Sequence, residues 1–299
     1  MLWSKAIGAG GAGGAAGILF GPRGVFGGGN RSPKYDIIDY ITIATLGNAI
    51  DFGNLSVVVT DNAATSDGSR GVFGGGDDNI IGLTTRIEYI TIATLGNAIN
   101  FGSLTAARRA LAATSNGSRG VFGGGTGGTG ATTLIDYITI ATTGNAIDFG
   151  DLTVARYHIA ATSNGTRGVF GGGALSINVI DYITIATPGN ATDFGDLTVG
   201  RFALAAVSDG SRGVFGGGSE NVIDYITIAT PGNATDFGDL VAGQRVEIAG
   251  ASDGTRGVFA GGNVGSNIID YITIATPSNS VDFGDLTYGR SVTAGTSGG

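Results

Sequence analysis

The stretch Arg167-Gly-Val-Phe-Gly-Gly-Gly173 is followed by Asp181-Tyr-Ile-Thr-Ile-Ala-Thr187 and then by Asp193-Phe-Gly-Asp-Leu197. These three segments form one unit that recurs six times along the chain, at intervals of about 43 to 49 residues. In the sixth copy alanine replaces the first glycine of the triplet. A repeat of this length is typical of the blades of a β-propeller. The arginines that open the copies are Arg23, Arg70, Arg119, Arg167, Arg212 and Arg256.

Each unit predicts four antiparallel strands. In the fourth copy residues 157–163 are a strand candidate, and the Asn164-Gly165 pair that follows is typical of a two-residue hairpin turn with positive φ at both central residues. The Arg-Gly-Val-Phe segment is the second strand, and its terminal glycines allow backbones to approach closely. The third strand, Asp-Tyr-Ile-Thr-Ile, is rich in β-branched and aromatic residues, and we expect both of its faces to be buried. A turn then leads to a short fourth strand around Asp-Phe-Gly-Asp-Leu.

The two ends of the chain predict how the repeats are arranged. The first copy begins near its second strand, whereas the chain ends with a segment, residues 290–299, that matches a first strand without its second. We therefore expect residues 290–297 to complete the first blade. The predicted fold is all-β, a six-bladed β-propeller of four-stranded antiparallel blades without a long open edge, formed by residues 20–299. Residues 1–19 are a Gly/Ala-rich N-terminal arm, in which Trp3 anchors to another subunit, folds back on its own domain or is part of a disordered tip.

Composition narrows the class of partner. The chain has 42% hydrophobic and 13% charged residues, so it can bury a large core, yet no apolar stretch approaches the ~18 residues of a membrane span. The net charge of -8, with only 16 Lys and Arg, argues against a nucleic-acid partner because phosphate binding needs clustered cations. The chain has no cysteine, which excludes disulfides and thiol chemistry but does not distinguish an intracellular from an extracellular protein.

Two motifs that invite an enzymatic interpretation recur along the chain, Asp-Phe-Gly in five of the six copies and the glycine cluster in all six, which favours an architectural role. Asp-Phe-Gly holds magnesium in protein kinases, but no His-Arg-Asp segment accompanies it here. The glycine clusters lack the Gly-Lys-Ser/Thr of a phosphate-binding loop. His158 is the only histidine, and no local motif supplies a serine and an acid beside it, so we expect a residue of no special role. We predict no catalytic, cofactor-binding or metal-ligating residue.

One acidic residue per copy precedes the tyrosine of the third strand. Because one arginine also opens each copy, we expect these acids and arginines to pair within or between blades. A calcium or magnesium site formed by a ring of these acids near the channel is an alternative, and a glycosidase pair is another, although identical placement in every copy argues against a single active site. The acids are Asp39, Glu88, Asp136, Asp181, Asp224 and Asp270.

The unit resembles the kelch repeat over about residues 21–290. Gly27-Gly28-Gly29 matches the kelch glycine doublet, Tyr40 its following tyrosine, and Phe52 the position of its tryptophan, where phenylalanine marks a divergent member. This resemblance implies β-propeller blades. Kelch-like oxidases use a copper site of histidine, tyrosine and a cysteine-modified tyrosine, and this chain lacks the cysteine and a second histidine. The kelch arginine that precedes the next blade matches Arg156, Arg201, Arg245 and Arg290.

The Gly-Val-Phe-Gly-Gly-Gly and Ile-Asp-Tyr-Ile-Thr-Ile-Ala-Thr segments are more similar still to repeats in predicted structural proteins of marine tailed bacteriophages. This resemblance implies a non-enzymatic protein of the virion, an extracellular particle, with a place in the tail or its fibres. Its partners would be other virion proteins, reached through the arm and the variable loops, or a receptor or glycan of the host surface. A lectin-like or glycan-hydrolysing propeller is the alternative.

The segment that varies between copies indicates where a partner would bind. Between the glycine cluster and the acid of the third strand the copies have 9, 11, 10, 7, 5 and 7 residues, and variable length beside a fixed scaffold is typical of an exposed loop. Tyr35 is the only aromatic residue in these loops, which favours protein contact over sugar binding. The candidate contact residues are Trp3 in the arm, Tyr35, Asp77, Asp78 and Arg86 in the loops, and Arg109, Arg156, Arg201 and Arg245 in the connections between blades.

Overall fold

The computed structural model describes residues 20–29, 35–263, 265–291 and 294–299, which contain strands β1 to β29 and, within these ranges, no helix. The strands form six four-stranded antiparallel sheets, one three-stranded sheet and one two-stranded sheet. The predicted all-β class is therefore confirmed. Trp3 and the N-terminal arm of residues 1–19 lie outside the described residues.

The six large sheets, numbered here along the chain, each pair their strands in sequence order, except that sheet 1 takes its first strand from the C-terminal segment. Sheet 1 consists of β29 (Ala294–Gly298), β1 (Arg23–Gly27), β2 (Ile37–Thr42) and β3 (Ile50–Asn54); sheet 2 of β5 (Ala63–Ser66), β6 (Arg70–Gly74), β9 (Arg86–Thr91) and β10 (Ile99–Ser103); and sheet 3 of β11 (Ala112–Ser115), β12 (Arg119–Gly123), β15 (Leu134–Thr139) and β16 (Ile147–Asp151). Sheet 4 consists of β17 (Ala160–Ser163), β18 (Arg167–Gly171), β19 (Val179–Thr184) and β20 (Thr192–Asp196); sheet 5 of β21 (Ala205–Ser208), β22 (Arg212–Gly216), β23 (Val222–Thr227) and β24 (Thr235–Asp239); and sheet 6 of β25 (Ile248–Ser252), β26 (Arg256–Gly261), β27 (Ile268–Thr273) and β28 (Val281–Asp285).

Two small sheets lie in the longest variable loops and were not predicted from the sequence. The three-stranded sheet joins the connection before sheet 2 to the loop of that sheet, and the two-stranded sheet is a hairpin in the loop of sheet 3. Their strands are β4 (Val59–Thr60), β7 (Asp77–Asp78) and β8 (Gly82–Leu83), and β13 (Thr126–Gly127) and β14 (Gly130–Ala131).

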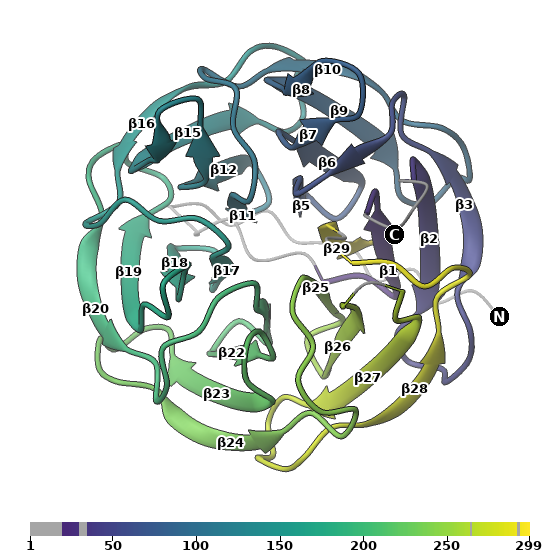
Figure 1. Cartoon of the computed structure of the whole chain (residues 1–299), viewed down its shortest axis with the longest axis vertical. Helices are drawn as coiled ribbons and strands as arrows, with labels where there is room; N and C mark the ends of the chain where they lie inside the picture. The colour runs from purple at the N-terminus through teal and green to yellow at the C-terminus, as the bar shows by residue number, and fades with distance from the viewer. Residues whose placement is uncertain (1–19, 30–34, 264, 292–293) are drawn as a thin grey trace, which may run out of the picture.

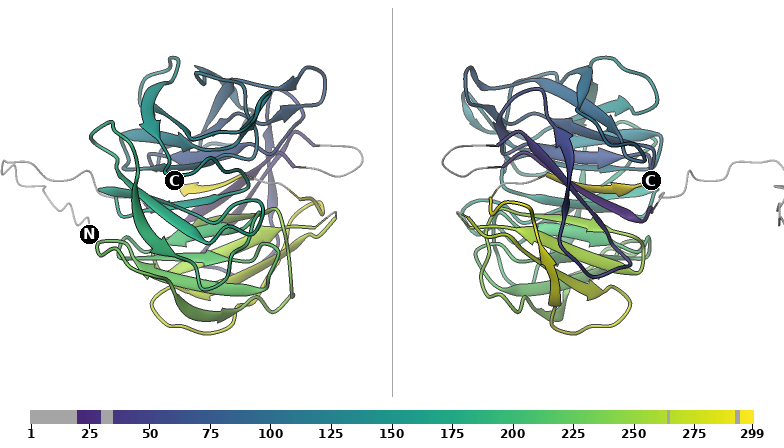
Figure 2. Two further views of the ribbon diagram at one scale, coloured as in Figure 1. Left: turned by 60° about the vertical axis from the view of Figure 1, so that its left-hand side comes forward. Right: turned by 90° about the vertical axis from the view of Figure 1, so that its right-hand side faces the viewer.

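The first strands of the six sheets lie around a common centre. They contact one another in the order β29, β5, β11, β17, β21 and β25, and β25 in turn contacts β29. Viewed down the shortest axis of the molecule, these strands are innermost and the fourth strands lie at the rim (Figure 1). β29 pairs with β1 over its whole length, as the C-terminal segment predicted. Side views show the turns and loops at the two ends of the strands (Figure 2).

Serine hydroxyl groups link these innermost strands at one end of the centre. Ser66 Oγ donates a hydrogen bond of 2.6 Å to the carbonyl of Ser297, and Ser115 Oγ donates one of the same length to the carbonyl of Ser66. The hydroxyls of Ser163, Ser208 and Ser252 each bond the preceding serine in the same way. A hydrogen bond of this kind contributes about 1 kcal/mol. The recurring Ser at the end of each first strand therefore fixes neighbouring sheets to one another.

The turn between the first and second strands differs from the predicted two-residue turn. β5 ends at Ser66 and β6 begins at Arg70, so three residues connect them, and positive φ occurs only at Gly68, where it is 87°. Asp67 Oδ1 accepts hydrogen bonds from the backbone N–H groups of Ser69 and Arg70 at 2.8 and 2.7 Å. Because the aspartate side chain satisfies these two donors, Asp67 itself needs no left-handed conformation.

The core consists of six apolar clusters, each formed between two adjacent sheets. Between sheets 4 and 5, the ring of Phe215 packs so closely on Gly171 that a Cβ there would lie 2.7 Å from the ring. The final residue of the second strand is therefore glycine in sheets 1 to 5 because the next sheet places a phenylalanine over it. On the third strand, Ile180 and Ile183 are buried, Tyr182 is half-buried and Thr184 is exposed, so the expectation of two fully buried faces is only partly right.

The arginines that open the copies do not pair with the third-strand acids, so that prediction is wrong. Each guanidinium instead lies over the tyrosine of its own sheet, 4.2 to 4.9 Å from the ring centroid. Each also donates to a backbone carbonyl directly after the third strand of the next sheet: Arg119 Nη1, for example, lies 2.8 Å from the carbonyl of Ile185. Arg256 of sheet 6 bonds the carbonyl of Ala44 after sheet 1 at 3.0 Å, so these contacts also join the last sheet to the first.

Candidate functional site

The variable loops and the connections between sheets lie at one end of the molecule, here called the loop end. The connection before sheet 2 pairs with its variable loop, Val59 opposite Asp78, and the connection before sheet 3 forms a bridge between Arg109 and Thr126. In sheet 4, the backbone N–H of Ala174 donates to a carbonyl in the connection at 2.8 Å. The variable loops are therefore held to the connections by backbone hydrogen bonds.

Five connections each bury an arginine against the acid of the third strand. The nitrogen-to-oxygen distances are 2.7 to 2.9 Å. The guanidinium also donates to backbone carbonyls; Arg156, for example, bonds the carbonyl of Gly172 at 2.9 Å. Burial lowers the pKa values of Arg156, Arg245 and Arg290, while the adjacent carboxylates act in the opposite direction. The pairs are Arg108 with Asp136, Arg156 with Asp181, Arg201 with Asp224, Arg245 with Asp270, and Arg290 with Asp39.

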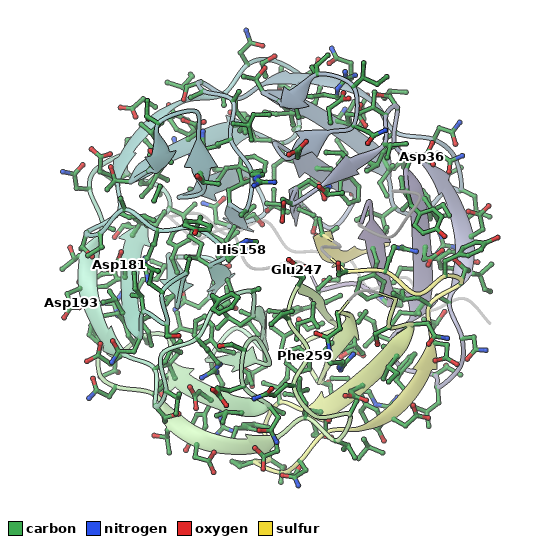
Figure 3. The ribbon with its side chains drawn as sticks, in the orientation of Figure 1. Asp36, His158, Asp181, Asp193, Glu247 and Phe259 are labelled. Atoms are coloured by element: carbon green, nitrogen blue, oxygen red, sulfur yellow. The ribbon has the colours of Figure 1, made fainter. Side chains whose placement is uncertain are left out.

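These ion pairs correct two predictions. Arg156, Arg201 and Arg245 are at most 2% exposed, so their side chains are not available to a partner. The alternative of a metal site formed by the third-strand acids near the channel is also wrong, because the five aspartates are buried and paired with arginine, and Asp181 lies within sheet 4, away from the centre (Figure 3). In the connection before sheet 3, the equivalent residue is Arg108, and Arg109 follows it.

The connection before sheet 2 has a different arrangement. Val59 takes the arginine position, and the acid is Glu88, which accepts hydrogen bonds from the backbone and hydroxyl of Ser56. Arg86 Nη1 lies 3.6 Å from Glu88 and its Nη2 lies 3.8 Å from Asp78. Asp78 is buried, and its Oδ1 accepts the backbone N–H of Ile80 at 2.8 Å. Asp78 therefore shapes the turn of the loop and does not itself face a partner.

Two other predicted residues lie exposed or half-buried at the loop end. Arg109 is 44% exposed and forms ion pairs with Asp77 at 3.1 Å and with Asp61 at 3.6 Å. Tyr35 is half-buried, and its ring lies 5.6 Å from that of Tyr288, which is 52% exposed. Tyr288 belongs to the connection between sheet 6 and sheet 1, so the sequence did not place it beside Tyr35. The pair forms an aromatic surface assembled from two distant segments.

The loops carry the most exposed large apolar side chains among the described residues. Leu175 is 91% exposed, Ile80 is 87% exposed and Ile81 is 67% exposed. Ile80 and Ile81 lie in the turn between β7 and β8, and Leu175 lies in the loop of sheet 4, where its φ is 66°. A leucine with positive φ carries a steric cost, and because the side chain of Leu175 is in solvent, burial does not offset that cost.

A ring of equivalent residues surrounds the centre at the loop end, directly before the innermost strands. We call Asp61, Ala110, His158, Ala203 and Glu247 the mouth ring. Each has a φ between 55° and 62°, and the backbone N–H of each of the last four donates at 2.8 Å to the carbonyl of the one before it. The ring therefore binds successive connections together through the backbone, whatever side chain each position carries.

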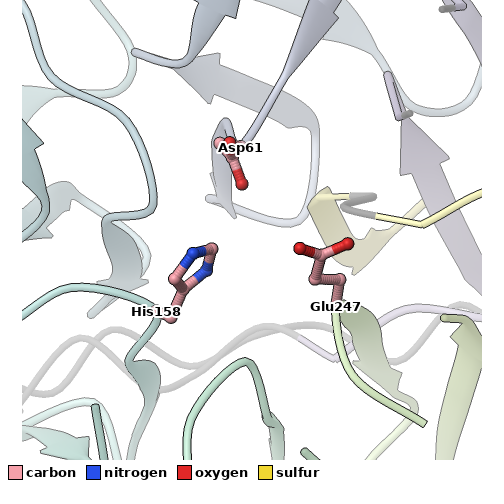
Figure 4. Close-up of side chains that lie close together, drawn as sticks. All are labelled: Asp61, His158 and Glu247. Carbon is pink, nitrogen blue, oxygen red and sulfur yellow. The ribbon is translucent and has the colours of Figure 1, made fainter. Parts of the chain in front are cut away.

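Three members of the mouth ring carry polar side chains that converge on the centre. One imidazole nitrogen of His158 and one carboxylate oxygen each of Asp61 and Glu247 lie within 4.8 Å of one another. Figure 4 shows the three side chains pointing toward one another. They line a cavity of about 120 Å³ whose remaining wall is largely alanine from the innermost strands. Sequence reasoning missed Asp61 and Glu247 and gave His158 no role. An alignment of the connections would have shown that the residue type at this position differs between copies, from acidic to alanine to histidine.

Asp61 is largely enclosed at the edge of the cavity. Its side chain is 11% exposed, and its Oδ1 atom is buried without a hydrogen-bond partner among the described residues. Burial raises the pKa of Asp61; the neighbouring His158 and Arg109 lower it, whereas Glu247 and Asp77 raise it further. A cation at the centre of the cluster would relieve the repulsion between the two carboxylates.

Comparison with known proteins assigns the chain to no family. No family model and no curated protein matches it. Among the residues that the structure describes, no helix is long and apolar enough to cross a membrane.

Proposed function

We propose that the six sheets are the blades of a divergent kelch-like, six-bladed β-propeller, closed by β29. The cyclic order of contacts among the innermost strands and the pairing of β29 with β1 support this assignment. The bonds from Arg256 to the carbonyls of Ile43 and Ala44 support it further, because they join sheet 6 to sheet 1 in the same way as other neighbouring sheets are joined.

The propeller serves, in this proposal, as a non-enzymatic structural and interaction protein of a virion, in the tail or tail fibre of a bacteriophage. The observation that carries the interaction role is the exposure of Leu175, Ile80 and Ile81 on loops that differ between copies. Apolar side chains in solvent at the tips of loops are typical of contact sites for other proteins. Repeated residues build the scaffold, so the partner is expected to contact the residues that do not repeat.

The first test is whether the chain is present in purified virions, measured by mass spectrometry of tail and capsid fractions. The second compares two triple variants. Ile80→Ser, Ile81→Ser and Leu175→Ser together should abolish incorporation or adsorption while the melting temperature stays unchanged. The matched control replaces Ile50, Ile99 and Ile147 by serine; these are 55 to 59% exposed at the rim and recur between copies. Equal loss in both variants, or no loss in the first, would refute the contact role of the loops.

Glycan binding is the second candidate, favoured by the contact between Tyr35 and Tyr288. Sugar rings stack on exposed aromatic side chains, and two adjacent rings offer such a surface. A glycan array probed with the intact chain and with Tyr288→Ala distinguishes the two functions. Binding that disappears in this variant and persists in the Ile80, Ile81 and Leu175 variant would favour the lectin-like function.

A further inference from the structure

The mouth ring departs from the repeat in a way that architecture does not explain. Its backbone is the same at each described position, with φ between 55° and 62°, and two of the positions hold alanine. Alanine is therefore sufficient for the fold there. Asp61, His158 and Glu247 occupy the positions before sheets 2, 4 and 6, and the two alanines occupy those before sheets 3 and 5. Over these five described positions, polar side chains thus alternate with alanine.

The distances suit a single ion. Since the three donor atoms lie within 4.8 Å of one another, a point between them lies no more than about 2.8 Å from each, which is 4.8 Å divided by √3. Zinc bonds to imidazole nitrogen and carboxylate oxygen are about 2.0 to 2.2 Å long. A displacement of less than about 1 Å for each donor atom closes this difference, and rotation about the side-chain bonds of the three residues can produce it.

The types of the donor atoms, one imidazole nitrogen and two carboxylate oxygens, indicate which ion the site would bind. Calcium and magnesium take oxygen ligands, whereas imidazole favours zinc and other divalent transition metals. Two carboxylates would neutralise a divalent charge, and Oδ1 of Asp61 is buried without a partner, which is a cost that coordination would remove. Arg109, 3.6 Å from Asp61, and Asp77 beside it are the other charged groups that the structure places next to the cluster.

We propose that Asp61, His158 and Glu247 bind one divalent transition-metal ion, with Zn²⁺ as the reference ion, at the loop end of the central cavity. The ion would join the connections before sheets 2, 4 and 6, which are far apart in sequence. Three protein ligands leave at least one coordination position for water or for a group of a partner. This site is independent of the proposed virion function.

Zinc binding can be measured on the intact chain without a polyhistidine tag. Isothermal titration calorimetry with ZnCl2 should give one site per chain. Because His158 is the only histidine, the imidazole resonances in an NMR spectrum belong to it without further assignment, and they should shift on zinc addition. His158→Ala, Asp61→Asn and Glu247→Gln should each weaken zinc binding by at least about tenfold. Glu220→Gln, which removes a carboxylate from another loop at the same end, is the control and should bind as the native chain does.

His158→Ala should remove the imidazole without disturbing the backbone, because Ala110 and Ala203 adopt the same backbone conformation at equivalent positions. Loss of binding in this variant, with an unchanged melting temperature in the presence of EDTA, would support the site. Absence of zinc binding by the native chain would overturn the proposal and leave an ion pair between His158 and the two carboxylates as the role of the cluster. Binding that all three ligand variants retain would overturn it equally, since the zinc would then lie elsewhere.

Discussion

The connection before sheet 2 and the connection before sheet 4 follow the same path with different chemistry. Before sheet 4, Arg156 is buried against Asp181, and the backbone N–H and hydroxyl of Thr153 donate to the same carboxylate. Before sheet 2, Ser56 makes the equivalent two hydrogen bonds to Glu88, but valine replaces the arginine and the half-exposed Arg86 approaches from the loop. The common requirement is a carboxylate that accepts the two donors of the connection. The buried arginine is one of two ways to balance its charge.

The largest effect is expected where the buried arginine is removed. Arg201→Ala leaves Asp224, which is fully buried, without its counter-ion, and should cost about 3 to 5 kcal/mol of the free energy of unfolding. Urea denaturation measures this cost. The double variant Arg201→Met with Asp224→Asn removes both charges, keeps a side-chain oxygen that accepts from Thr198, and should lose much less. If Arg201→Ala lowers the free energy of unfolding by less than ~1 kcal/mol, the carboxylate of Asp224 is protonated or solvated once the arginine is gone.

A second comparison between a regular copy and an exception concerns the glycine under the next sheet's phenylalanine. A Cβ on Gly171 would lie 2.7 Å from the ring of Phe215, whereas the sixth copy holds Ala260 at this position, fully buried in the cluster that contains Phe26. Gly171→Ala should therefore cost about 1 to 3 kcal/mol through overpacking. Ala260→Gly is the reciprocal variant, and thermal unfolding ranks the two. Equal stability of Gly171→Ala and the native chain would mean that each sheet pair can adjust as sheets 6 and 1 do.

The sequence predicted what recurs and missed what depends on contacts between distant segments. The four strands of each repeat, the all-β class and the pairing of the C-terminal segment with β1 follow from the repeated pattern, whereas the two small sheets of the loops do not. The partner of each charge does not, because Arg23 and Arg290 are both possible partners for Asp39 in sequence and only the path of the connection selects Arg290. The convergence of Asp61, His158 and Glu247 also required the structure, since these residues are separated by about two copies each.

An intermediate effect is expected in the exceptional connection. Glu88→Gln keeps the shape of the side chain and a carbonyl acceptor for Ser56 but removes the charge that faces Arg86 at 3.6 Å. Because Arg86 is 37% exposed, solvent screens this ion pair, and the loss should be about 1 kcal/mol, well below that of Arg201→Ala. Chemical denaturation of both variants under the same conditions gives the ratio. A loss for Glu88→Gln as large as for Arg201→Ala would remove the distinction between the two kinds of connection.

The smallest effect on stability is expected at the loop tips. Leu175 is 91% exposed with a φ of 66°, so the native leucine gains little from burial and has an unfavourable backbone conformation. Asparagine adopts positive φ more readily, and Leu175→Asn should leave the free energy of unfolding within ~0.5 kcal/mol or raise it. Thermal unfolding tests this directly, and a clear loss would show that the leucine packs within the chain. A residue that costs stability by its conformation and contributes none by burial fits a contact with another molecule, in contrast to the buried arginines of the connections, whose partners all lie within the fold.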